Sequence, residues 1–260
     1  MRKLLVFLTM FLTMNVFSKD LGKVVFEKDN FFAITSEFNE DLYNDFAEKV
    51  YGYNDKTLTI YFDSPGGSVF SLARIVGLMA SSKVNFICIA RFAASAAFIM
   101  FEHCNERYLL PEGILMSHNA SGSLSGEIPR MRHVLDMIEG VLDQLDTKVA
   151  ERMKIPLLDY KGLIANELWM NRTLAEKYNA IDGVATDVSC SKDLVKRKVQ
   201  KSVQYMTLFG AMNVRLESSA CPLITRVKKI NSKDSDESSM DAIIKGIGGV
   251  TTLPPFYLNR

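Results

Sequence analysis

The stretch "TLTIYFDSPGGSVFSLARIVGLMASSKVNFICIA", residues 57–90, decides the fold class. It contains an apolar run at 57–62, a glycine-rich turn, an amphipathic helical pattern at 69–82 and a second apolar run at 84–90. Strands that alternate with helices at short intervals are typical of a parallel sheet with crossover helices. The stretch therefore predicts a βαβ unit within an α/β protein.

The pattern continues toward the N-terminus. Strands are expected at 23–27 and 31–38, and a helix at 40–53 whose first turn Asn39 would cap. The apolar side chains Leu42, Phe46 and Val50 share one face of this helix.

Toward the C-terminus, a helix at 94–104 is expected, then short strands at 107–110 and 114–119, then a long helix at 127–153. Pro129 suits the first turn of that long helix. Its apolar stripe is made of Met131, Leu135, Ile138, Leu142, Leu145 and Val149. Such a stripe either covers the sheet or extends to a subunit interface, and the sequence leaves both open.

The charge balance argues against a nucleic-acid partner. Among 260 residues there are 31 Lys and Arg against 30 Asp and Glu, and no basic cluster is interleaved with aromatic residues. No His or Cys cluster has the spacing of a zinc site. The chemistry is therefore expected to need no metal and no cofactor.

The N-terminal segment 1–18 is typical of an export signal. Arg2 and Lys3 precede an apolar run from Leu4 to Phe17, and Ser18 follows it. A bilayer span needs about 20 apolar residues, so this run is short for an anchor. We expect a periplasmic or secreted protein, with membrane contact only if the signal stays uncleaved.

Export would place the cysteines in a compartment where disulfides persist. The chain has 4 Cys, and sequence alone leaves three pairings open. A bridge between Cys190 and Cys221 is one expectation, because both lie in a C-terminal extension at 190–260 whose composition differs from the rest. Cys88, inside an apolar strand, is expected to be a buried free thiol.

The stretch "ARFAASAAFIM", residues 90–100, places Ser95 where a strand is expected to become a helix. A serine at such a turn is exposed above the sheet, and the helix N-terminus supplies free N–H groups. The turn "SPGG" at 64–67 ends the preceding strand, so the Gly67 N–H is open to a ligand. His118, at the end of a strand, is the best-placed base of the three histidines. Each feature taken alone also suits ordinary packing.

Three blocks of the sequence resemble the proteolytic subunit of the Clp proteases. They are "FDSPGGS" at 62–68, "ARFAASAAFIMF" at 90–101 and "RYLLPEGILMSHNASG" at 107–122, and they stand in the family's order. The resemblance spans residues 23–187. It implies a crotonase-like fold of stacked βαβ units with a protruding long helix, and a peptidase domain at 19–189.

The resemblance also implies roles for single residues. Ser95 would be the nucleophile, His118 the general base, and the N–H groups of Gly67 and Ala96 the oxyanion hole. Counting back from Asp182 places Glu167 at the family's third catalytic position, where the family has Asp. Asn166 beside it is the alternative partner for His118.

The function expected from these residues is an exported serine peptidase that cleaves peptides or unfolded proteins and assembles as a homo-oligomer. The segment by which the family meets an ATP-driven unfoldase has no match here, so no such partner is expected. The main alternative is an inactive crotonase-fold binding or scaffold protein in the periplasm, because Ala97 replaces a family glycine. A Ser/Lys peptidase using Lys148 or Lys154, and an acyl-CoA enzyme, are further alternatives.

Overall fold

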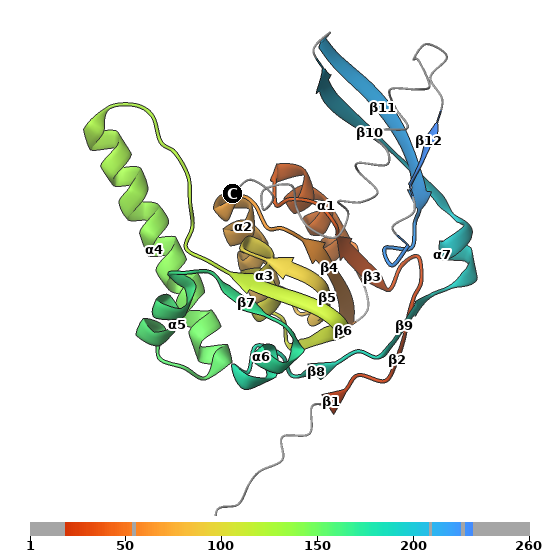
Figure 1. Cartoon of the computed structure of the whole chain (residues 1–260), viewed down its shortest axis with the longest axis horizontal. Coiled ribbons are helices and arrows are strands. Elements are labelled where there is room, and N and C mark those ends of the chain that lie inside the picture. Colours follow the sequence, from red (N-terminus) through yellow and green to blue (C-terminus); the bar gives the residue numbers. More distant parts are fainter. Residues whose placement is uncertain (1–18, 54–55, 208–209, 225–226, 231–260) are drawn as a thin grey trace, which may run out of the picture.

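In the computed structural model (Figure 1), the described residues are 19–53, 56–207, 210–224 and 227–230. The expected signal segment at 1–18 and the end of the C-terminal extension, 231–260, lie outside the described residues. No helix in the part of the chain that the structure describes combines the length and apolar character needed to cross a membrane.

The main sheet has seven strands. Six follow one another in the order β1-β8-β6-β5-β4-β3 with parallel pairing, and β7 pairs antiparallel with β6. This is the parallel α/β sheet that residues 57–90 predict. The strands are β1 (Lys19–Asp20), β3 (Phe31–Ile34), β4 (Thr57–Ser64), β5 (Asn85–Ala94), β6 (Glu106–Ser117), β7 (Leu168–Met170) and β8 (Gly183–Val184).

Helices follow strands as the sequence predicts. Asn39 caps the first helix, since its Oδ1 accepts a hydrogen bond from the Leu42 N–H at 2.9 Å. The helices are α1 (Glu40–Tyr51), α2 (Val69–Ser81), α3 (Ala96–Glu102), α4 (Ile128–Met153), α5 (Leu157–Ile164), α6 (Arg172–Lys177) and α7 (Lys192–Lys196).

The two faces of the sheet belong to different hydrophobic clusters. Ile60 and Phe62 of β4 enter the larger cluster, which also contains the apolar faces of α1, α2, α3 and the end of α4. Tyr61, between them, enters a smaller cluster with Phe26 and Leu194. Because side chains alternate along a strand, β4, β5 and β6 each contribute to both clusters.

The two short strands expected at 107–110 and 114–119 are one strand, β6. Leu109 pairs with Ala90 and Ile114 pairs with Phe92, so the intervening residues 110–113 have no partners in the register. The prediction of two strands was wrong because the proline and glycine in this segment interrupt the pairing without ending the strand.

The long helix α4 has two different halves. Leu145 and Val149 are buried in the core, whereas Leu135 and Met137 are 47% and 46% exposed. Figure 1 shows the N-terminal half of α4 standing away from the sheet. The apolar stripe therefore covers the sheet with its C-terminal half only.

The C-terminal extension begins on the second face of the sheet. The strand β9 (Asp187–Cys190) pairs parallel with β2 (Lys23–Phe26). An antiparallel sheet follows, made of β10 (Lys198–Thr207), β11 (Gly210–Ser219) and β12 (Val227–Ile230). The predicted bridge between Cys190 and Cys221 is confirmed, with an S–S distance of 2.00 Å.

Cys88 forms a second disulfide, with Cys104, and is not the free thiol expected from the sequence. The helix α3 runs back along β5 after the turn at Ser95. Its end therefore lies beside the strand, and the two Cα atoms are 6.0 Å apart. The apolar strand pattern around Cys88 does not reveal this return of the chain.

A buried charged cluster fixes α3 against the sheet. Arg107 of β6 forms ion pairs with Glu102 at the end of α3 and with Asp182, whose Oδ1 lies 2.9 Å from Arg107 Nη2. Arg152 of α4 donates a hydrogen bond to the same Asp182 at 3.3 Å. Burial raises the pKa of Glu102 to about 7, against the effect of Arg107. The cluster connects α3, β6 and α4.

Candidate active site

Ser95 lies at the turn between β5 and α3. Its φ of +56° is in the left-handed region, which few non-glycine residues occupy. Its N–H donates to Met116 O of β6 at 2.9 Å, which holds the turn to the sheet. Its hydroxyl does not cap the helix and is therefore available for chemistry.

The glycine pair at 66 and 67 packs directly against this turn. A Cβ on Gly66 would lie 2.5 Å from Ala94 O and 2.7 Å from Ser95 Cβ, and the φ of Gly66 is +96°. Gly67 has a φ of +142° and is similarly close to Phe38. The SPGG segment is thus more than a tight turn, because only glycine fits between its neighbours and the serine.

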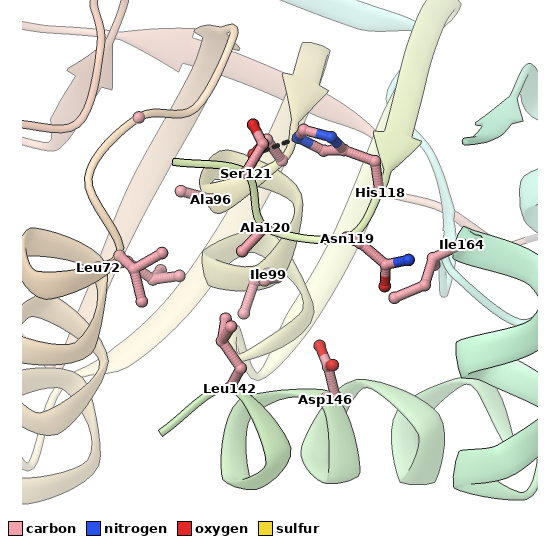
Figure 2. A pocket seen from close by; sticks show the side chains of 13 residues that line it. Leu72, Ala96, Ile99, His118, Asn119, Ala120, Ser121, Leu142, Asp146 and Ile164 are labelled. Atoms are coloured by element: carbon pink, nitrogen blue, oxygen red, sulfur yellow. Dashed lines mark hydrogen bonds between the residues drawn. The ribbon is translucent and has the colours of Figure 1, made fainter. Parts of the chain in front are cut away.

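His118 follows the last residue of β6. Its Nε2 lies 2.8 Å from Ser95 Oγ, the contact that the dashed line in Figure 2 marks. The two parallel strands β5 and β6 end side by side and bring these residues together across 23 positions of sequence. The geometry is that of a nucleophile and its general base.

Gly67 and Ala96, whose N–H groups are the predicted oxyanion hole, lie in the same region. Ala96 is the first residue of α3, so its N–H has no partner within the helix. No hydrogen bond from the Gly67 N–H is found in the described part of the chain. Gly67, Ser95 and Ala96 all line one pocket of about 310 Å³.

The fold agrees with the comparisons to known proteins. Residues 19–188 match the family model described as Clp protease. The chain belongs to the Clp protease family. A relative from Bacillus licheniformis, the ATP-dependent Clp protease proteolytic subunit 2, is 28% identical over 164 residues, which cover 60% of this chain and 86% of the relative. Membership in this family supports a peptidase with the ClpP-like α/β fold.

Glu167, the residue predicted to orient His118, is arranged differently from Ser95 and His118. Glu167 is exposed, has a φ of +62°, and accepts a hydrogen bond from Trp169 Nε1 at 3.1 Å. Its neighbour Leu168 pairs with Ser117, so the backbone brings Glu167 beside His118. Among the described residues nothing hydrogen-bonds His118 Nδ1. The roles of Glu167 and of the exposed Asn166 therefore stay predictions.

The other sequence candidates lie away from the serine. Lys148 is exposed and pairs with Glu151 at 3.3 Å, and Lys154 ends α4 at the surface. Neither lines the pocket at Ser95. Ala97, at the position of the family glycine, is fully buried in the core. Within the described residues no three His, Cys, Asp or Glu side chains gather in a way that could hold a metal ion.

Sequence reasoning missed one charged residue of the pocket. Asp146 of α4 lines the pocket together with Leu142, one helical turn earlier. It is only 8% exposed. The signal for it was present, since its spacing from Leu142 places this carboxylate beside the apolar stripe of α4.

Proposed function

We propose that this protein is an exported serine peptidase of the Clp proteolytic subunit type, which hydrolyses peptide bonds through an acyl-enzyme on Ser95 without an ATPase of its own. The observation that carries the proposal is the 2.8 Å contact between Ser95 Oγ and His118 Nε2 at the mouth of a pocket. A serine hydroxyl is a weak nucleophile until a base removes its proton.

The reaction would proceed in two steps. In the first, Ser95 Oγ attacks the scissile carbonyl, its proton passes to His118 Nε2, and the N–H groups of Gly67 and Ala96 stabilise the developing oxyanion. His118 then donates the proton to the leaving amine, and the acyl group stays on Ser95. In the second step His118 activates a water molecule that hydrolyses the ester.

The imidazolium formed in each step needs an orienting partner at Nδ1. We assign this role to Glu167, whose backbone adjoins His118 across the β6–β7 pair. The assignment requires the carboxylate to leave Trp169 and turn toward the imidazole when substrate binds. A Glu167→Gln variant should lose activity at neutral pH, whereas Asn166→Ala should retain it.

Export is supported by the N-terminal charge and hydropathy pattern and by the two disulfides, which persist in oxidising compartments. A homo-oligomer is supported by family membership and by the exposed apolar side chains on the N-terminal half of α4. In such a compartment the substrates would be peptides or unfolded proteins, and no ATP-driven unfoldase is assigned as a partner.

The test is labelling of the mature protein with a fluorophosphonate, read by intact-mass spectrometry. A single adduct that is absent from Ser95→Ala and strongly reduced in His118→Ala is the expected result. A folded protein that forms no adduct would contradict the proposal and favour the inactive binding or scaffold protein. An adduct that survives in His118→Ala would point to another base.

A further inference from the structure

The pocket beside Ser95 has a distinct chemical layout. Its sides are formed by apolar residues, Leu72 of α2, Ile99 of α3, Leu142 of α4 and Ile164 of α5. Figure 2 shows His118 at one end and Asp146 at the other, with Ile99 and Leu142 on one side and Asn119 and Ile164 on the other. The pocket therefore combines an apolar passage with a carboxylate at the end remote from the reacting atoms.

The charge of Asp146 interacts electrostatically with Lys161 but forms no ion pair with it. Among the described residues, no side chain or backbone group hydrogen-bonds or ion-pairs with this carboxylate. The nearby cation Lys161, which is partly buried, is paired with the exposed Asp143 at 2.5 Å. A charge buried without a partner destabilises a folded protein. A carboxylate that faces a pocket can obtain its partner from a ligand.

We propose that this pocket binds the side chain of the substrate residue whose carbonyl acylates Ser95, and that Asp146 selects lysine or arginine at that position. This inference rests on the proposed function. The oxyanion donors Gly67 and Ala96 line the same pocket as Asp146, so a carbonyl held by them brings its own side chain to the pocket entrance.

The chemistry of a basic side chain fits each part of this pocket. Its methylene stem would contact the apolar residues, as the stems of Lys and Arg commonly do. Its charged end would form a charge-assisted hydrogen bond with Asp146, away from bulk water. A neutral aliphatic side chain of the same length would leave the carboxylate desolvated and unpaired. The pocket would therefore bind a basic side chain more tightly than a neutral one.

Several titratable groups surround Asp146. The pKa of Asp146 is raised to about 6, mainly by burial; Lys161 lowers it and Asp143 adds to the rise. Tyr160 of α5 has its hydroxyl bonded to Ser117 at 2.7 Å, and His118 lies at the far end of the pocket. Asp146 is thus ionised at neutral pH and becomes neutral in mild acid, where the attraction for a cation is lost.

The experiment compares two peptide substrates that differ only at the residue before the scissile bond, arginine in one and its neutral isostere citrulline in the other. Because the mature protein cleaves both through Ser95, the ratio of their kcat/KM values removes the titration of His118. We expect arginine to be favoured about 100-fold at pH 8, the scale of a buried charge pair. The preference should fall as the pH is lowered through 6.

Asp146→Asn tests the residue itself. This variant should lose the preference for arginine, so that the ratio of the two kcat/KM values falls to about one. Asp136→Asn, an exposed carboxylate on the same helix, is the matched control and should keep the preference. Fluorophosphonate labelling, which does not depend on the substrate side chain, checks that Ser95 still reacts in both variants, and in Asp136→Asn it should match the wild type.

The outcomes separate this inference from the proposed function. A wild-type protein that labels at Ser95 but cleaves the two peptides equally overturns the role of Asp146 and leaves the peptidase standing. An arginine preference that persists in Asp146→Asn also overturns the role of Asp146 without contradicting the peptidase function. A wild-type protein without labelling or cleavage overturns both proposals.

Discussion

Replacing Asp146 with Asn should make the protein more stable at neutral and alkaline pH. The carboxylate is 8% exposed and has no partner among the described residues, and its burial raises the pKa from 3.8 to about 6. This difference corresponds to about 3 kcal/mol at full ionisation, at about 1.4 kcal/mol for each pH unit. Residual contact with water in the pocket reduces the expected gain to about 2 kcal/mol.

The sign follows from the direction of this pKa change. A carboxyl group with a raised pKa in the folded state binds more protons there than in the unfolded chain. Its contribution to stability is therefore greatest below pH 3.8 and is lost as the pH rises through about 6. The variant, which cannot ionise, should match the wild type near pH 4 and exceed it above pH 7.

The assay is urea unfolding of the mature protein and of Asp146→Asn at several pH values between 4 and 8, with disulfides intact. Asp136→Asn serves as the control, because that carboxylate is exposed and should change the free energy of unfolding by less than about 0.5 kcal/mol. A gain that is the same at pH 4 and pH 8 would refute the reasoning, and so would a loss of stability at pH 8.

Gly66→Ala should abolish fluorophosphonate labelling while the fold persists, because the new Cβ would lie 2.5 Å from Ala94 O at the base of the serine turn; normal labelling would show that the turn can adjust. Arg107→Met leaves the buried Glu102 without its cation and should lower the free energy of unfolding by about 3–5 kcal/mol in urea titrations, whereas a loss below 1 kcal/mol would mean that the cluster is dispensable. Cys190→Ser opens a disulfide with a sequence separation of 31 and should cost about 3–4 kcal/mol by the chain-entropy estimate; an unchanged thermal midpoint would argue against a structural role.

Much of the fold could be predicted because its signals are local. The apolar runs and helical periodicity around residues 57–90 specify strands and helices, and the short connections specify parallel pairing. Ser95 and His118 could be predicted for the same reason. Both follow strands, and neighbouring parallel strands end at one edge of the sheet. The Cys190–Cys221 bridge followed from the position of both residues outside the core pattern.

Other features depend on contacts between distant segments. The return of α3 along β5 pairs Cys88 with Cys104, and strand periodicity does not reveal where a short helix ends in space. The side chain of Glu167 accepts a hydrogen bond from Trp169. Alignment with a family motif does not reveal which rotamer a side chain adopts.

The sequence by itself determined the parallel α/β architecture and the serine–histidine pair, because periodicity, turn chemistry and strand order are properties of neighbouring residues. Only the tertiary structure decided that the carboxylate of Asp146 lies in the pocket of Ser95. Residue 95 lies at the β5–α3 turn and residue 146 lies in α4, and the two meet only when that helix packs against the rest of the fold. Burial, and with it the pKa and the pairing of a charge, is set by that packing and not by the local sequence.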